Sequence, residues 1–325
     1  KALDKINQKK KSLTAFLLFF ALQSVSLQAQ NPVHQQRSAI DFDSIINADA
    51  FSEAHARKFA ELIIQDSGGR MKPANTFSSE LLRKVSKSDT YQGLNSDQVL
   101  LSIMNNPAVW YNVPLIYLKR GNDSIRKLAG LDAKAKYAPL LSFFYNKGNY
   151  KLATPLEEAY RAAVPNQFQK DFIELDRKVN LLYSALEGKV MRIFPLPNDV
   201  NNKWVSYPEL AEANFTGNDS LYVRNILPLY FQSLRLAQQD GDYTQANNLL
   251  ESIHGFQKKF GGEVLPNQEK VRAEIVYNKY DIFKKLFSWY IYAGTLFFAV
   301  LIFQIFKSNR FISFTVRAFQ AILVV

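Results

Sequence analysis

The feature that most constrains this chain is a run without charged residues near its C-terminal end, Leu286 to Phe306, with the sequence LFSWYIYAGTLFFAVLIFQIF. A helix needs about 20 apolar residues to cross the hydrocarbon core of a bilayer, which is about 30 Å thick. Because the run reaches that length, we expect residues 284–306 to form a transmembrane helix.

Two further apolar segments stand near the ends of the sequence. The stretch LTAFLLFFALQSVSL follows Lys9–Lys11, and it fits either a short transmembrane helix or a secretory signal that ends near Ala29. Residues 311–325 are apolar apart from Arg317 and resemble the first part of another membrane helix. Since the sequence starts with Lys1 and stops inside this segment, we expect a fragment of a longer membrane protein.

The basic residues beside these segments predict the orientation. Lys9–Lys11 precede the first segment, and Lys307 and Arg310 lie between the last two. The positive-inside rule places both clusters in the cytoplasm, and therefore predicts a multi-pass protein of the inner membrane with a large outer domain. The predicted parts are a basic end with a first transmembrane or signal-like helix (1–30), the outer domain (31–283), a transmembrane helix (284–306), and a cytoplasmic loop with the start of the next helix (307–325).

Residues at the outer end of the 284–306 helix give mixed support to this orientation. Lys284 and Lys285 lie on the side predicted to be outside, which counts slightly against it. Trp289, Tyr290 and Tyr292 would lie at the outer headgroup level, where amphipathic rings are enriched.

Charge and cysteine content narrow the function. The net charge is +11, but the lysines alternate with acidic residues along predicted helical faces, so we expect no nucleic-acid partner. A solvated basic surface with some attraction to anionic membrane lipid or an acidic partner fits better. The chain has no cysteine, which excludes disulfides, thiol redox centres, cysteine-bound metals and covalent attachment of haem to the chain itself.

The periodicity of the outer part predicts a mainly α fold. A narrow stripe of apolar residues over 171–187 needs a partner helix, and 221–239 with 243–260 predict a helical hairpin. Residues 192–204 predict a loop, and residues 108–119 a short strand. Predicted helices also cover 51–65, the stretch that begins at Asn75 or Thr76, the stretch capped by Ser96, the stretch with a capping box at Thr154–Glu157, and a final helix that runs from about 267 into the membrane segment.

The segment GGRMKP, residues 68–73, combines glycines with basic residues and raises the question of a phosphate-binding loop. It lacks the G-x-x-x-x-G-K-[ST] pattern between a strand and a helix, so it is no P-loop. One interpretation is structural: a helix C-cap, a turn, and the start of the next helix. The other is that Arg70 and Lys72 contact an anionic group such as a haem propionate or a lipid phosphate.

The histidines do not predict a catalytic or metal site. His34 lies in a polar segment, His55 falls on the apolar stripe of its helix as a core histidine would, and His254 flanks another stripe. None stands near a second ligand at metal-binding spacing. We therefore expect no catalytic residue and no metal ligand here, and no tight haem binding by residues 31–283 alone.

Several longer stretches resemble cytochrome c biogenesis proteins, namely the fused CcsB/CcsA (ResB/ResC) haem lyases of the System II pathway in Bacteroidetes-like bacteria. The resemblance covers about 51–306 and is carried by QDSGGRMKPANT (65–76) with ELLRK (80–84), LNSDQVLLSIMNNPAVWYNVPLIYLK (94–119), YKLATPLEEAY (150–160), RIFPLPNDVNNKW (192–204) and AEIVYNKYDIFKKLF (273–287).

The resemblance implies a membrane protein that exports haem and attaches it to C-x-x-C-H apocytochromes. It implies apocytochrome c and haem as partners, with a periplasmic outer domain acting as scaffold or apocytochrome-docking domain. The family's W-G-x-x-W-x-W-D segment is missing from this sequence, since Trp110, Trp204 and Trp289 stand alone. Haem would therefore be bound by parts of the full-length protein outside this sequence, and whether this part is an enzyme stays open.

Two rival hypotheses remain. The first is a membrane-anchored helical adaptor of the envelope with no haem role, which the predicted helical hairpin favours. The second is a secreted enzyme released by cleavage near Ala29, against which the segment 286–306 counts.

Overall fold

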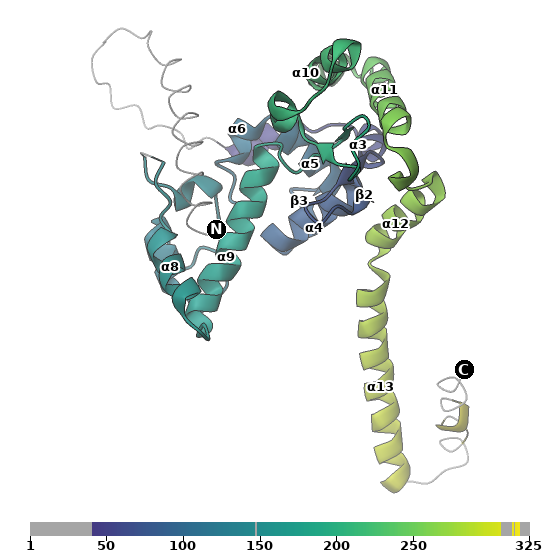
Figure 1. Ribbon diagram of the computed structural model, residues 1–325. Coiled ribbons are helices and arrows are strands. Elements are labelled where there is room, and N and C mark those ends of the chain that lie inside the picture. The colour runs from purple at the N-terminus through teal and green to yellow at the C-terminus, as the bar shows by residue number, and fades with distance from the viewer. Residues whose placement is uncertain (1–40, 147, 307–313, 315, 319–325) are drawn as a thin grey trace. The chain divides into compact units, whose positions relative to one another are not determined.

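The structure is a computed structural model that describes residues 41–146, 148–306, 314 and 316–318 (Figure 1). It divides into two compact units, residues 1–271 and 272–325. The predicted mainly α fold is confirmed. The helices are α2 (Phe42–Ala48), α3 (Glu53–Ala60), α4 (Ala74–Ser86), α5 (Ser96–Asn105), α6 (Pro107–Trp110), α7 (Asp123–Ala129), α8 (Ala153–Arg161), α9 (Gln167–Leu186), α10 (Gly217–Asp240), α11 (Thr244–Phe260), α12 (Gln268–Tyr280) and α13 (Ile282–Phe306).

Short antiparallel ribbons connect the helices of the first unit. Each ribbon in the described residues has two strands, and the pairs are β1 (Ile63–Gln65) with β2 (Met71–Pro73), β3 (Thr90–Tyr91) with β4 (Leu94–Asn95), β5 (Ile116–Tyr117) with β6 (Tyr137–Ala138), and β7 (Phe194–Pro195) with β8 (Trp204–Val205). Two-stranded ribbons are marginally stable by themselves in water. Each ribbon therefore depends on the helices packed around it.

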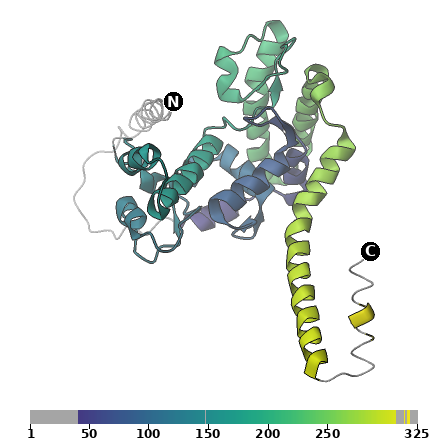
Figure 2. The ribbon, with the colours of Figure 1, turned by 60° about the horizontal axis from the view of Figure 1, so that its bottom comes forward.

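The long helix α9 behaves as its sequence predicts. Its apolar stripe is buried, and α8 is the partner helix, lying beside it in both views (Figures 1 and 2). Asn166 begins α9 with a capping box in which its side chain accepts from Gln169 N and Gln169 Oε1 accepts from Asn166 N. The predicted capping box of α8 is wrong, because that helix begins at Ala153 and Leu152 is its N-cap, without a side-chain hydrogen bond.

The helical hairpin predicted near the end of the outer part is present as α10 and α11. Gly241, with φ of 79°, ends α10 in the left-handed region. Ala246, Leu250 and Ile253 on α11 are buried, as the pattern predicted. Within the first unit, this hairpin packs against α3, β7 and the 3₁₀ helix Tyr207–Glu212.

The helix predicted over 51–65 is too long. α3 ends at Ala60, and residues 63–65 form β1 instead, because they pair with 71–73 in the register Ile63↔Pro73 and Gln65↔Met71. Residues 192–204, predicted as a loop, contain most of the β7–β8 ribbon. The predicted strand within 108–119 is confirmed only at β5, since 107–110 form α6.

The last helical stretch is interrupted, contrary to the uninterrupted helix predicted. α12 ends at Tyr280 and α13 begins at Ile282, with Asp281 between them at φ of 44° (Figure 1). Within α13, Lys285–Ile305 is long and apolar enough to cross a membrane, with a mean hydropathy of 1.9 and none of it buried. The predictions for residues 1–40, which include the first apolar segment and His34, and those for Lys307 and Arg310 lie outside the described residues.

Candidate functional site

The glycines of the GGRMKP segment lie in the turn of the β1–β2 ribbon. Asp66 organises this turn: its Oδ1 accepts from the backbone N–H of Gly68 at 2.8 Å and of Arg70 at 3.0 Å, and its carbonyl accepts from Gly69 N at 3.1 Å. Gly69 has φ of 85°, which suits glycine. The predicted helix C-cap at this position is wrong, because α3 has already ended at Ala60.

The turn between β7 and β8 repeats this arrangement. Asp199 Oδ1 accepts from the backbone N–H of Asn201 at 2.9 Å and of Lys203 at 3.0 Å, and the Asp199 carbonyl accepts from Asn202 N at 3.1 Å. Asn202 takes the place of Gly69 with φ of 50°. Asn tolerates this region better than most residues because its short side chain can hydrogen-bond locally. The segments DSGGR (66–70) and DVNNK (199–203) therefore share one turn structure.

A single side chain joins the two turns. Gln65, at the end of β1, donates from Nε2 to the carbonyl of Asn202 at 2.9 Å and accepts at Oε1 from Trp204 N at 2.8 Å. The backbone N–H of Gln65 also donates to the carbonyl of Arg192 at 3.0 Å. We call residues 66–70 and 199–203 together the paired-turn surface.

The side-chain amide of Gln257 connects helix α11 to both ribbons. Gln257 is 1% exposed; its Nε2 donates to the carbonyls of Ile63 at 2.8 Å and Ile193 at 3.0 Å, and its Oε1 accepts from Ile63 N at 3.2 Å. In an antiparallel ribbon the backbone groups of alternate residues point away from the partner strand. Gln257 satisfies those of Ile63, so α11 fixes the outer edge of β1.

The two predicted anion-contact residues have different surroundings. The Lys72 side chain is 6% exposed, and its ammonium lies 3.4 Å from Glu80 Oε2 and 3.7 Å from Asp66 Oδ2. The carboxylates of Asp66 in the turn and Glu80 on α4 therefore already balance its charge. Arg70 is exposed on the paired-turn surface. Lys203, which sequence analysis did not single out, holds the equivalent exposed position on the other turn.

A partly buried polar cluster links the start of α4 to the start of α5. Asn75 Nδ2 donates to both carboxylate oxygens of Asp97, at 2.8 and 3.1 Å, and the hydroxyl of Ser78 donates to Asp97 Oδ1. Burial raises the pKa of Asp97, and these hydrogen bonds oppose the increase. The N-caps of these two helices differ from the prediction. Pro73, rather than Asn75 or Thr76, is the N-cap of α4, and Asn95 rather than Ser96 is the N-cap of α5.

His55 lies in the core, as its place on the apolar stripe predicted. It is 2% exposed, and its ring nitrogens lie 3.0 Å from Asn247 Oδ1 and 2.8 Å from the Tyr230 hydroxyl. With the proton on Nδ1, the ring donates to Asn247 and accepts from Tyr230. Burial lowers the pKa of His55, so the neutral ring is favoured.

His254 lies on α11, seven residues beyond the Asn247 that contacts His55. At 1.5 Å per residue this places the two histidine levels about 10 Å apart along the helix. Both nitrogens of His55 already have partners, so the described histidines do not fit a haem site with two imidazole ligands. Among the residues that the structure describes, no three His, Asp or Glu side chains are placed to hold a metal ion.

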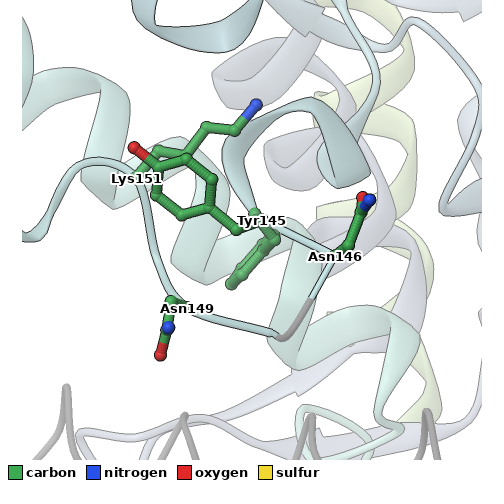
Figure 3. Close-up of a pocket in the computed structure, with 5 residues that line it drawn as sticks. Tyr145, Asn146, Asn149 and Lys151 are labelled. Carbon is green, nitrogen blue, oxygen red and sulfur yellow. The ribbon is translucent and has the colours of Figure 1, made fainter.

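A surface hollow of about 340 Å³ lies beside the turn that follows the 3₁₀ helix Leu140–Phe143 (Figure 3). It is lined by Phe144, Tyr145, Asn146, Asn149 and Lys151. The ammonium of Lys151 donates to the carbonyl of Ser142 at 2.8 Å and lies 5.5 Å from the centre of the Tyr145 ring. The lysine thus holds the local chain together, and these lining residues include no acid–base pair.

No family model matches this chain. It is similar to the protein NrfI of Wolinella succinogenes, with 30% identity over 269 residues that make up 80% of this chain. The match covers 28% of the length of that relative. The chain therefore corresponds to about a quarter of the curated protein to which it is similar.

Proposed function

We propose that this chain is part of a membrane protein of cytochrome c maturation, which exports haem and attaches it to C-x-x-C-H apocytochromes. The similarity to NrfI carries the proposal, because it supports a cytochrome c biogenesis family over 80% of the chain. The fused CcsB/CcsA form of the System II pathway is the finer part of the proposal. The apolar segment Lys285–Ile305 is consistent with a place in the inner membrane.

In this proposal residues 31–283 form a periplasmic domain that serves as scaffold or docks the apocytochrome. The partners are apocytochrome c and haem. Haem is held by parts of the full-length protein outside this chain, which agrees with the engagement of both His55 nitrogens by Asn247 and Tyr230. The docking role falls to the paired-turn surface, because Gln65 and Gln257 hold two exposed turns rigidly side by side.

The alternative is a helical adaptor of the envelope, anchored in the membrane, with no haem role. The helical hairpin of α10 and α11 favours it, because three leucine side chains of α10 are exposed: Leu221 at 63%, Leu229 at 50% and Leu236 at 49% of their surface. Spacings of eight and seven residues place these leucines near one face of α10. An adaptor would use such a face to bind another protein.

The test uses the full-length gene in its own host. We expect its deletion to abolish covalent haem in the c-type cytochromes that depend on it, measured on haem-stained gels. In the full-length protein, the double variant Arg70→Ser/Lys203→Ser is expected to lower this signal severalfold at unchanged protein level. The control is Lys134→Ser/Arg161→Ser, which removes two exposed positive charges elsewhere in the first unit.

The outcomes separate the hypotheses. Normal cytochromes after gene deletion would favour the adaptor and overturn the maturation role. Loss of cytochromes on deletion, with full maturation in Arg70→Ser/Lys203→Ser, would keep the maturation role and remove docking from the paired-turn surface.

A further inference from the structure

The break between α12 and α13 gathers aromatic and basic side chains. Asp281 forms a backbone hydrogen bond on each side of it: its N–H donates to the carbonyl of Tyr277 at 3.0 Å, and its carbonyl accepts from Lys285 N at 3.1 Å. The left-handed conformation of Asp281 nevertheless turns the chain at this point (Figure 1). All of these residues lie in the unit that begins at Arg272.

One tyrosine lies at the centre of the cluster. The ammonium groups of Lys279 and Lys285 lie 5.9 and 5.8 Å from the centre of the Tyr280 ring. Tyr277 and Phe283 stand three residues before and after Tyr280 in the sequence, and their rings pack edge to face at 5.8 Å. The ring face attracts cations, so both lysines have a favourable contact with the same tyrosine.

The exposure of these side chains indicates what the cluster faces. Phe283 is 69% exposed and Tyr280 is 51% exposed, and neither Lys279 nor Lys285 forms an ion pair with any residue that the structure describes. Exposed rings next to two uncompensated ammonium groups suit an environment that is apolar on one side and anionic on the other. The headgroup region of a bilayer that contains anionic lipid has this character.

The position in the chain agrees with this environment. Lys285 is the first residue of the segment long enough to cross a membrane, and Trp289 follows it by about one turn with 70% exposure. Lysines at this end count against the predicted orientation of the helix if their role is only to set topology. Binding of a lipid phosphate gives them another role.

We propose that Lys279, Tyr280 and Lys285 form a binding site for the phosphate of an anionic phospholipid headgroup. The two ammonium groups contact the phosphate oxygens, while Tyr280 holds the lysines together and Phe283 contacts the adjoining acyl region. The proposal does not depend on the role in cytochrome maturation.

The test is native mass spectrometry of the whole chain in detergent, titrated with phosphatidylglycerol or with phosphatidylcholine. A lysine near an anionic surface strengthens binding by about 1 kcal/mol, which is about fivefold. We therefore expect Lys279→Ala and Lys285→Ala to weaken phosphatidylglycerol binding by about fivefold each, and the double variant by about 30-fold. Phosphatidylcholine binding is expected to stay unchanged in all of them.

The matched control is Lys134→Ala/Lys136→Ala in the first unit, where Lys136 lies 5.4 Å from the centre of the Tyr137 ring. It removes the same charge and one similar cation–ring contact, and we expect no change in lipid binding. Tyr280→Leu keeps an apolar side chain without the ring and is expected to weaken binding by about two- to fivefold. Circular dichroism spectra verify that each variant keeps its helices.

Three results would overturn the proposal. The first is phosphatidylglycerol affinity in Lys279→Ala/Lys285→Ala within twofold of the wild type. The second is an equal loss in the control. The third is displacement of the lipid by millimolar inorganic phosphate, which would identify a site for free phosphate rather than for a lipid headgroup.

Discussion

Replacing Gln257 by Leu tests whether helix α11 holds the ribbon β1–β2 in place. The substitution keeps the helix propensity and roughly the size of the side chain but removes all three of its hydrogen bonds. The groups left without a partner are the N–H and carbonyl of Ile63 and the carbonyl of Ile193. Ile63 is 4% exposed and Ile193 is fully buried, so water reaches these groups poorly.

The expected cost follows from these groups. A buried backbone group without a hydrogen bond costs about 1–3 kcal/mol, and three of them cost about 3–5 kcal/mol if the two carbonyls are at the low end. Burying a leucine in place of an amide returns about 1–2 kcal/mol. The free energy of unfolding should therefore fall by about 3 kcal/mol. In a domain of this size that corresponds to a melting temperature lower by about 6–12 °C.

The assay is thermal unfolding of the purified chain in detergent, followed by the fluorescence of the buried Trp110 and Trp204. Gln257→Glu provides a second variant of nearly the same volume. Its carboxylate can still accept from Ile63 N but faces two carbonyl oxygens, so we expect it to be at least as unstable at pH 7.5. Gln245→Leu is the control, because Gln245 is exposed on the same helix.

The result that would refute this reasoning is a Gln257→Leu protein that melts within about 2 °C of the wild type while Gln245→Leu is also unchanged. The amide of Gln257 would then add nothing that leucine cannot replace. Equal losses in both variants would instead point to the helix itself rather than to the hydrogen bonds with β1.

Two further predictions concern the turns and pH. Gly69→Ala should lower the melting temperature by about 2–8 °C, because a residue with a side chain pays about 1–2 kcal/mol to adopt the φ of 85° found there. Asn202→Gly, at the equivalent position of the other turn, should not lower the melting temperature. Equal losses in the two variants would contradict the shared turn structure. Burial lowers the pKa of His254 and His55 below 6.5, so the neutral forms stabilise the fold above pH 6.5 and that stability is lost as pH falls toward the folded pKa. Melting curves from pH 7.5 to 5 should decline less in His254→Gln than in the wild type, and equal slopes would contradict this.

Sequence analysis located the helices whose burial pattern is local and strong. The stripe of α9 and the hairpin of α10 and α11 repeat apolar residues at helical spacing over many turns, and no distant contact is needed to recognise them. Their ends were less well predicted. Asn95 is the N-cap of α5 where Ser96 was expected, because both are good N-cap residues and the local sequence does not choose between them.

The predictions failed where distant residues decide the structure. Leu62, Ile63 and Ile64 continue the apolar pattern of α3, yet residues 63–65 form a strand that pairs with 71–73 and is held by Gln257. These partners are 6 to 194 residues away in the sequence. The break at Asp281 is a similar case, since neither Gly nor Pro marks it.

Of the two turns that form the candidate site, sequence analysis singled out only the one at 66–70. The segment around Arg70 attracted attention through its glycines and charges, but Lys72 on the neighbouring strand proved to be buried between carboxylates. Lys203 was missed because RIFPLPNDVNNKW was predicted to be a loop. The available signal was the shared spacing of Asp, then a Gly or Asn three residues later, then a basic residue, at Asp66 and again at Asp199.

The shared turn structure has a consequence for how this surface can work. A two-stranded ribbon alone does not hold its turn in one place. Here Gln65 bonds the end of β1 to the backbone of Asn202 and Trp204, and Gln257 bonds the start of β1 to α11. Neither turn can therefore shift without breaking buried hydrogen bonds in the other ribbon or in the core. A partner that binds the paired-turn surface meets two fixed turns, and little ordering entropy opposes its binding.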